Sequence, residues 1–189
     1  ISSVKSTRKI TSAMKMVAAS KLRRAQDLAE SSRVYADSLS FILSSLAGNT
    51  KNSSDLPEIL TGRENSKISL LIINSSDRGL CGGFNGTVTR QTRAEVARLQ
   101  AENKTVKLMM IGRKSADALR REFGDLYFDR YEGLQGTSVN YSDAAKIADA
   151  IRVGFQAGEF DVCTLIFNKF KNAITQEITL TQLIPVEVD

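Results

Sequence analysis

A long, uninterrupted helical pattern at the start of the chain constrains the fold more than any other feature. Residues 3–47 contain neither proline nor glycine, and apolar or small residues recur there at steps of three and four positions. This spacing predicts a single helix with a continuous seam along one side. At 1.5 Å per residue the helix would be about 68 Å long, which exceeds the width of a small domain, so it must project.

The seam of this helix is built from small side chains in its middle part. Small residues allow two helix axes to approach closely, as they do in a tight coiled coil. No second helix of comparable length is predicted downstream, so the seam requires a partner helix. The seam residues are Val4, Thr7, Thr11, Met14, Ala18, Leu22, Ala25, Ala29, Ser32, Ala36, Leu39, Leu43 and Leu46.

The positive charge of the chain is concentrated in the same segment. The whole chain has a net charge of +5, whereas residues 1–26 contain no Asp or Glu and seven basic residues: Lys5, Arg8, Lys9, Lys15, Lys21, Arg23 and Arg24. Such a stripe suits an acidic partner, which could be nucleic acid, an anionic membrane or a protein surface, although it could also be a solvated helix face. Residues 1–34 contain no aromatic side chain to stack on bases, so nucleic-acid binding is the less favoured alternative.

The rest of the chain has a different pattern. Residues 48–66 are rich in turn formers and predict a linker with room for one helical turn. Alternating strand-like and helix-like segments follow, which predicts an α/β domain with right-handed crossovers. The predicted strands are 67–74, 104–111, 127–131, 161–168 and 173–184, the last one antiparallel or at an edge, and the predicted helices are 88–103, 115–123 and 141–157. The expected architecture is α/β: a long coiled-coil helix (1–47), a linker (48–66) and a Rossmann-like α/β domain (67–189).

The composition argues against several classes of function. Histidine is absent, which removes Ser/His and Cys/His catalytic pairs and histidine-bound metals. Cys81 and Cys163 lack the spacing of a zinc site or a disulfide framework, and we expect both to be buried thiols. No apolar run approaches the roughly 18 residues that a membrane span requires. We therefore expect no catalytic residue, no metal and no direct membrane span.

A glycine-rich turn after the first predicted strand is the only candidate for a cofactor site. Glycines at this position can let backbone N–H groups approach a phosphate. However, GLCGGFNG matches neither GxGxxG nor GxxxxGK[ST], and no acid for a ribose follows the second predicted strand. A structural turn is therefore favoured over a nucleotide-binding site, and we expect the chain to bind no cofactor of its own. The turn residues are Asp77, Arg78, Gly79, Cys81, Gly82 and Gly83.

Three segments in a fixed order resemble the gamma-subunit family of the F-type ATP synthase. They are ISSVKSTRKITSAMKMVAASKLRRAQ at residues 1–26, SDRGLCGGFN at 76–85 and IFNKFKNAITQEITLTQLIP at 166–185. The resemblance implies a non-catalytic rotor subunit whose N-terminal helix pairs with a C-terminal helix and enters the hexamer of alpha and beta subunits. It also implies that this chain lacks the family's extreme N-terminus and its C-terminal helix.

The resemblance further implies which residues and partners carry the function. Ile10, Met14, Lys15 and Val17 would lie where the shaft meets the beta subunits. Acidic loops of the beta subunits would face Lys5, Arg8, Lys9, Lys21, Arg23 and Arg24. The α/β domain would lie near an epsilon-type (or delta) subunit and the ring of c subunits, with ATP, ADP and magnesium bound by the partners and no nucleic acid involved. The chain would be peripheral, at the inner face of a bacterial plasma membrane or a mitochondrial inner membrane.

Overall fold

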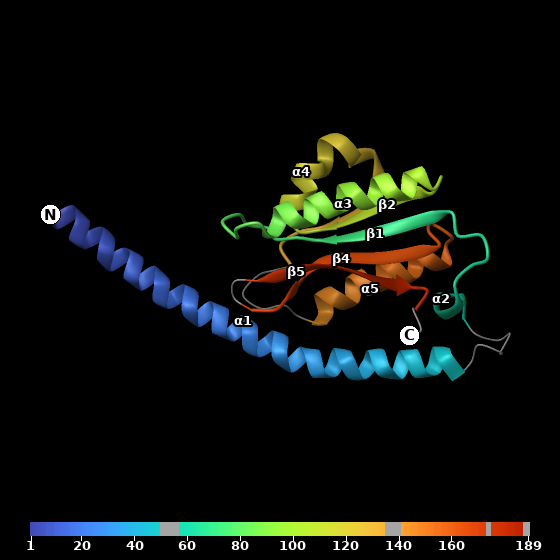
Figure 1. Ribbon diagram of the computed structural model, residues 1–189, viewed down its shortest axis with the longest axis horizontal. Helices are drawn as coiled ribbons and strands as arrows, with labels where there is room; N and C mark the ends of the chain where they lie inside the picture. Colours follow the sequence, from blue (N-terminus) through green and yellow to red (C-terminus); the bar gives the residue numbers. More distant parts are fainter. Residues whose placement is uncertain (50–56, 135–140, 173–174, 187–189) are drawn as a thin grey trace. The chain divides into compact units, whose positions relative to one another are not determined.

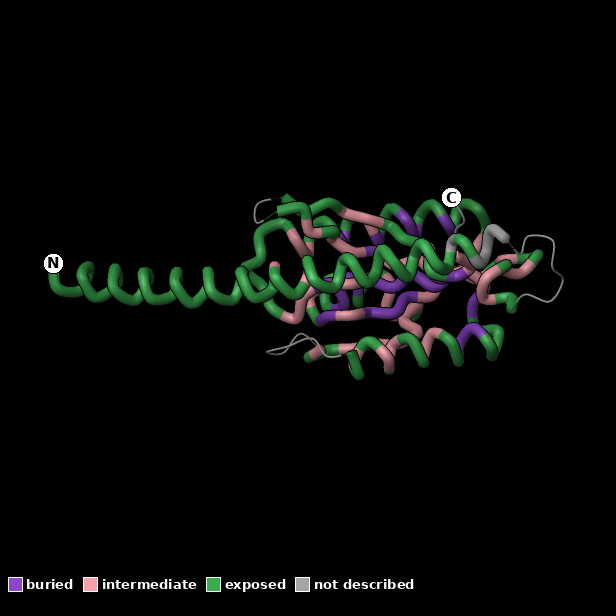
Figure 2. Tube along the Cα trace, turned by 90° about the horizontal axis from the view of Figure 1, so that it is seen from below, coloured by how far each residue is buried: buried purple, intermediate pink, exposed green. Residues whose placement is uncertain are grey.

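The long predicted helix is present as a unit of its own. The computed structural model describes residues 1–49, 57–134, 141–172 and 175–186, except the side chains at 44 and 46–49. Contacts divide the chain into two compact units, Ile1–Asn49 and Thr50–Asp189. The first unit is a single helix, α1 (Ser2–Asn49), of 48 residues, and nearly all of its described positions are exposed (Figures 1 and 2).

The second unit is built on one five-stranded sheet with the order β3-β2-β1-β4-β5. β1 to β4 are parallel, and β5 is antiparallel to β4. This is the strand order of the first five strands of a Rossmann fold, with the last one reversed, which confirms the predicted fold class. The strands are β1 (Ile68–Asn74), β2 (Thr105–Ile111), β3 (Tyr127–Tyr131), β4 (Val162–Phe170) and β5 (Gln176–Ile184), and the predicted residues 173 and 174 lie outside the described ranges.

Helices cover both faces of this sheet. The helix after β1 and the helix after β2 lie on one face, and the helix after β3 lies on the other (Figure 1). Right-handed crossovers produce this division, because the strand order turns back at β1. The helices of this unit are α2 (Glu58–Thr61), α3 (Phe84–Ala101), α4 (Arg113–Phe123) and α5 (Tyr141–Gln156), with a 3-10 turn at η1 (Gly124–Leu126).

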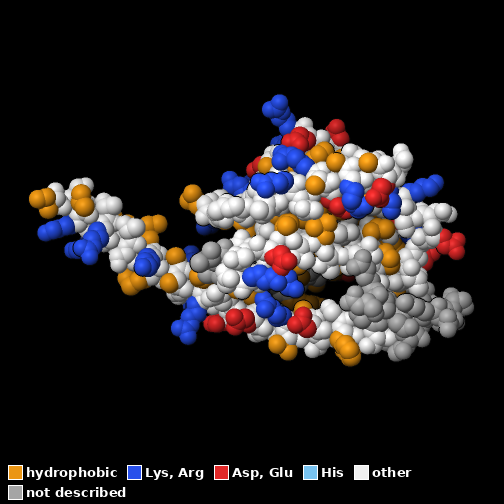
Figure 3. All heavy atoms as spheres, viewed as in Figure 1, with side chains coloured by type: hydrophobic (Ala, Val, Ile, Leu, Met, Phe, Trp, Pro, Cys, Tyr) orange, Lys and Arg blue, Asp and Glu red, His pale blue; other side chains and the backbone are white. Residues whose placement is uncertain are grey.

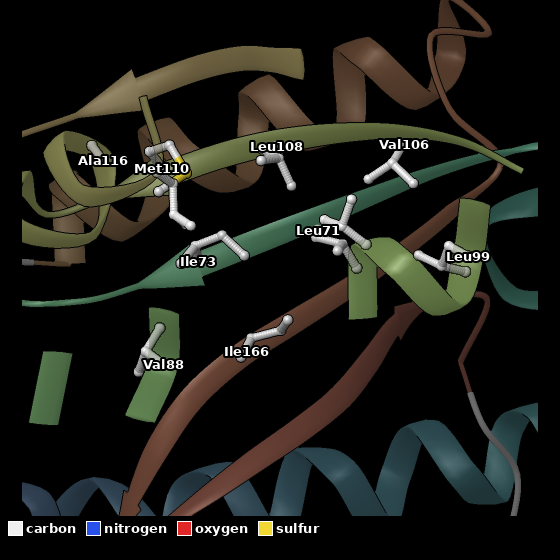
Figure 4. Close-up of a cluster of buried hydrophobic side chains, with 11 residues drawn as sticks. Leu71, Ile73, Val88, Leu99, Val106, Leu108, Met110, Ala116 and Ile166 are labelled. Atoms are coloured by element: carbon white, nitrogen blue, oxygen red, sulfur yellow. The ribbon is translucent and has the colours of Figure 1, made fainter. Parts of the chain in front are cut away.

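Burial on both faces explains why residues 70–73 of the central strand β1 are all apolar rather than alternating with polar residues. Leu71 and Ile73 point to the side of α3 and α4, where they pack with Val88, Leu108 and other apolar side chains (Figure 4). Leu70 and Ile72 point to the opposite side and pack beneath α5. All four strand residues are at most 1% exposed. Burial of such a side chain stabilises the fold by about 1.5–3 kcal/mol.

Two helices begin earlier than the sequence pattern predicts. α3 starts at Phe84 rather than at residue 88, so Gly86 lies in the helix and not in the turn. α4 starts at Arg113 rather than at residue 115. In both cases polar groups just after β1 form hydrogen bonds with the first helical turn. The apolar spacing begins two to four residues later and carries no information about these contacts.

Three phenylalanine rings fill the core on the α5 side. The rings of Phe128 and Phe160 meet edge to face with centroids 6.0 Å apart, and Phe155 lies 6.1 Å from Phe160. Gly154 of α5 allows this packing, because a Cβ there would lie 2.9 Å from Phe160 Cε1 and 3.1 Å from Phe128 Cζ. Gly86 of α3 differs, since a Cβ built on it would meet nothing within 4 Å.

These two helical glycines give a matched prediction. Gly154→Ala should lower the free energy of unfolding by about 1–3 kcal/mol, because the added methyl group overpacks the phenylalanine cluster. Gly86→Ala should raise it by up to about 1 kcal/mol, because alanine favours the helix and nothing obstructs its methyl group. Urea unfolding of the α/β signal measures both, and shifts of the same sign would contradict the packing described for Gly154.

Candidate functional site

The exposed face of α1 carries an apolar groove. The groove is shallow and is lined by Ile10, Ala13, Met14, Val17, Ala18 and Lys21. Met14 is 66% exposed and Ile10 60% exposed, although both are large apolar side chains. Contiguous apolar side chains that stay in water mark a surface for another macromolecule. The helix therefore brings Ile10, Met14, Val17 and Lys21, all predicted contact residues, onto one surface.

Most basic residues of the same helix lie on its opposite half. At about 100° per residue, the positions of five basic side chains are turned away from the groove. These are Lys5, Arg8, Lys9, Lys15 and Arg23, whereas Arg24 lies at the groove's side. Basic and hydrophobic side chains follow one another along the N-terminal part of α1 (Figure 3). The predicted contact residues therefore form two surfaces, one apolar and one basic, which a single flat partner surface cannot cover together.

The glycine-rich turn needs only one of its glycines for its own conformation. Gly82 has a φ of 59°, which favours glycine, and Leu80 has a φ of 61° although it is not glycine. A Cβ added at Gly82 or Gly83 would meet nothing within 4 Å, and one at Gly79 would meet only Lys114 Cε at 3.8 Å. The Leu80 side chain is fully exposed. Steric crowding within the chain therefore does not explain the other glycines.

Asn85, which the sequence analysis did not single out, holds this turn closed. Its Oδ1 accepts a hydrogen bond from the backbone N of Ser76 at 3.0 Å, and its Nδ2 donates to Ser76 Oγ at 2.9 Å. Nδ2 also lies 3.1 Å from Cys81 Sγ. These contacts join the first turn of α3 to the end of β1. The only signal in the sequence is a polar residue two positions after a pair of glycines, which is too common to identify such a role.

Asp77 ties together the chain segments that follow three strands. Its Oδ1 accepts a hydrogen bond from the backbone N of Arg113 at 3.1 Å, and its Oδ2 accepts one from the backbone N of Gly133 at 3.1 Å. The side chain of Arg113 also donates to the Asp77 carbonyl oxygen at 3.4 Å. Both carboxylate oxygens thus contact backbone groups, a structural role that leaves the carboxylate poorly placed as an acid or base.

The first turn of α4 is satisfied from within the domain. The backbone N of Lys114 donates to Ser76 O at 3.0 Å, and that of Ser115 donates to Ser75 Oγ at 3.2 Å. Gly112, with a φ of 89°, lets this approach occur, because a Cβ there would lie 2.1 Å from Ser75 O. In a dinucleotide-binding Rossmann domain an acid at the end of the second strand holds the ribose. Here Gly112 follows the second strand, and Ser75 and Ser76 contact it and the first turn of α4.

The described part of the chain has neither a cluster of metal-binding side chains nor a membrane-spanning helix. The described residues contain no group of three or more His, Cys, Asp or Glu that could hold a metal ion. None of the described helices has the length and apolar content needed to cross a membrane.

Comparison with known proteins decides the family. The family model described as ATP synthase matches residues 1–189. The chain is 47% identical over 188 residues to the ATP synthase gamma chain of Paramagnetospirillum magneticum and 49% identical over 188 residues to that of Gluconacetobacter diazotrophicus. The chain belongs to the ATP synthase gamma-chain family. Membership favours the rotor interpretation over the nucleotide-binding and nucleic-acid-binding alternatives.

Coverage and structural similarity add detail to this membership. The alignments cover 100% of this chain but only 64% of each of the two gamma chains. A chain in the cryo-EM structure of the central stalk and c-ring of Tetrahymena thermophila mitochondrial ATP synthase is 30% identical, with a TM-score of 0.54. That match covers 84% of this chain and 72% of the Tetrahymena chain. The described helix and sheet thus represent about two thirds of a gamma chain.

The two cysteines differ in a way that the sequence did not predict. Cys163 in β4 is buried, as expected, but Cys81 in the turn is exposed, so the expectation of a buried thiol there is wrong. The reason is that the turn projects beyond the sheet and buries few of its side chains. Burial raises the pKa of the Cys163 thiol to about 12.

Thiol labelling of the native chain should therefore report one cysteine. At pH 8 a thiol with a pKa of about 12 is a thiolate in only about one molecule in 10,000, and burial further restricts reagent access. We expect one thiol to react rapidly with Ellman's reagent, and Cys81→Ser to abolish that reaction. Cys163→Ser should leave it unchanged, and both thiols should react in urea. Two rapid thiols in the native wild-type chain would contradict the burial of Cys163.

Proposed function

We propose that this chain is the shaft-and-domain portion of a rotor subunit that couples proton flow to ATP synthesis without catalysing a reaction itself. The observation that carries the proposal is the exposed apolar groove of α1, set on a helix of 48 residues in a chain of the gamma family. A subunit of this type needs stiffness and an asymmetric surface. Nucleotide and magnesium would be bound by partner subunits.

The two surfaces of α1 supply the asymmetry that such a rotor needs. A surrounding subunit would meet the apolar groove in one rotational position and the basic face in another. A difference in contact free energy between positions is what biases a partner among conformations with different nucleotide affinity. The rotation itself would enter through the α/β domain, which we place near the c-subunit ring and an epsilon-type or delta subunit.

The resemblance to the gamma family implies which partners meet the two surfaces. Ile10, Met14 and Val17 would contact apolar side chains of the alpha and beta subunits. The basic residues opposite the groove would face acidic loops of the beta subunits. Charge complementarity of this type sets orientation and specificity more than affinity, which suits a surface that must turn between three positions. The protein would work as a peripheral component at the inner face of an energy-transducing membrane.

A charge placed in the groove tests the function directly. Met14→Lys in the full-length subunit should reduce ATP-driven proton pumping more than ATP hydrolysis, because a new ion pair with a partner acid would hold one orientation too strongly. Pumping into inverted vesicles and hydrolysis are measured on the same purified complex. Met14→Gln is the matched control, because glutamine has about the length of methionine and adds no charge to the groove.

The two substitutions separate the possible outcomes. The proposal predicts a lower ratio of pumping to hydrolysis for Met14→Lys and a smaller change for Met14→Gln. Equal loss of pumping and hydrolysis, or no loss of either, would count against Met14 as a contact residue. A complex that pumps equally well without this subunit would refute the rotor function altogether.

The 189-residue chain without partners offers a second test. Helix α1 exposes its seam, and its first turn contains no acidic residue to favour the positive end of the helix dipole. A helix of this type gains little stability from propensity alone. Limited proteolysis should therefore cut within residues 1–47 well before it cuts the α/β unit, and amides of β1 and β4 should exchange most slowly.

Addition of the C-terminal helix of a gamma chain as a peptide should restore protection between residues 18 and 46. A scrambled peptide of the same composition is the control. If residues 1–47 of the monomeric chain already resist protease and exchange slowly, the seam is satisfied within the chain and the shaft interpretation of α1 is wrong.

A further inference from the structure

Arg63 connects the segment before β1 to the end of α5 and to the residues just before β4. Its Nη2 donates to the carbonyl oxygen of Phe155 at 2.8 Å, and its Nη1 lies 3.3 Å from the carbonyl oxygen of Phe160. Its Nε pairs with Glu58 Oε2 at 2.9 Å, and Nη1 pairs with Asp161 Oδ1 at 3.4 Å. The guanidinium carbon also lies 4.3 Å from the centroid of the Phe155 ring. One side chain thus joins α2, the end of α5 and the residue before β4.

Asp161, just before β4, adds hydrogen bonds to the start of β1. Its Oδ2 accepts hydrogen bonds from the backbone N of Lys67 at 2.8 Å and of Ile68 at 2.9 Å. Its own backbone N donates to Ile68 O at 2.8 Å. Burial raises the pKa of Asp161, but the hydrogen bonds from Ile68, Lys67 and Arg63 outweigh burial and hold this pKa below its usual value. The carboxylate is therefore charged and fully engaged at neutral pH.

The same segment also touches the end of the last strand. Ile59 packs against the apolar cluster beneath α5. Gly62 has a φ of 80°, and a Cβ built on it would lie 3.0 Å from Cγ of Pro185, the residue after β5. The sequence analysis assigned residues 58–66 to a linker. In the structure this segment packs against the α/β unit through Ile59, Gly62 and Arg63.

We propose that Arg63 and Asp161 form a clasp that bears load between α1 and the sheet, with Arg63 as a positioning residue for rotary coupling. This inference rests on the proposed rotor function. Residues 58–66 lie in sequence between α1 and β1, so any force that the chain carries from one to the other along this connection passes through them. Four contacts of the Arg63 side chain hold residues 58–66 to Phe155, Phe160 and Asp161. A segment held in this way passes force to the sheet, whereas an unheld segment would absorb part of the force by bending.

The chemistry of the clasp requires arginine. The guanidinium is planar, presents five N–H donors in a fixed arrangement and can stack on an aromatic ring while it donates. The ammonium group of lysine is a point charge that cannot satisfy two carbonyl oxygens, two carboxylates and a ring face together. Arg63→Lys should therefore retain only part of the clasp, and Arg63→Met should retain the apolar contact with Phe155 alone.

The test uses the full-length subunit in the assembled, purified complex. Arg63→Met should speed amide exchange at Lys67 and Ile68 by about tenfold or more, the effect of losing charge-assisted hydrogen bonds. It should lower the ratio of ATP-driven proton pumping to ATP hydrolysis while hydrolysis persists. Arg63→Lys should give intermediate values of both, and it remains informative if Arg63→Met does not assemble.

A matched control separates the clasp from general loss of stability. Arg93 pairs with Glu122 at 2.6 Å between α3 and α4, away from residues 58–66, and both partners are about half exposed. Arg93→Met should leave the pumping ratio and the exchange at Ile68 unchanged.

Three results would overturn the clasp. They are unchanged exchange in the Arg63 variants, faster exchange with an unchanged pumping ratio, and an equal fall in the ratio for Arg93→Met. All three leave the proposed rotor function intact, because they are judged against a wild-type complex that pumps. Failure of the rotor function would appear instead as pumping that does not depend on the subunit at all.

Discussion

Burial of β1 on both of its faces is the constraint on which the α/β unit depends. The strand pairs with β2 along all of its residues and with β4 on its other edge, so every neighbouring strand is positioned from it. Its side chains enter two separate apolar clusters, one under α3 and α4 and one under α5. A change in the register of this strand would exchange the contents of the two clusters, which fixes the register strongly.

The residues that follow β1 hold together the segments at the carboxyl edge of the sheet. Ser75, Ser76 and Asp77 between them hydrogen-bond the start of α3, the first turn of α4 and the loop after β3. In nucleotide-binding relatives of this architecture the same edge is open for a ligand. Here Ser75, Ser76 and Asp77 hydrogen-bond groups of the domain itself, which holds the segments after β1, β2 and β3 together.

The helix α1 differs from the α/β unit. Its large apolar side chains are exposed, and propensity alone gives such a helix little stability, so its stability must come from packing against further segments or partners. The proposed rotor needs both kinds of element, a helix whose two faces differ and a domain that does not deform. Arg63 and Asp161 are of interest because they lie on the covalent path from one element to the other. Their contacts resist bending of residues 58–66, the segment that leads into β1.

The sequence by itself determined the elements whose signal is local. The three-and-four spacing specified α1, continuous apolar runs specified β1, β2 and β4, and the alternation of strands with helices specified a Rossmann-like sheet. Ile10, Met14 and Val17 share a face of any regular helix, but it was the family resemblance that implied a contact role for them, and that role stays a prediction. A resemblance carried by whole motifs supplied the family, which periodicity alone could not.

Only the tertiary structure decided what depends on contacts between distant residues. Asp77 meets backbone groups 36 and 56 positions away, and Arg63 meets carbonyl oxygens more than 90 positions away. The early start of α3 and the exposure of Cys81 likewise follow from how the turn is held against the end of β1. A polar residue in a loop has the same local appearance whether it is solvated or clasped. Its role is set by which segments the folded sheet brings within hydrogen-bond distance, and no local pattern in the sequence encodes that distance.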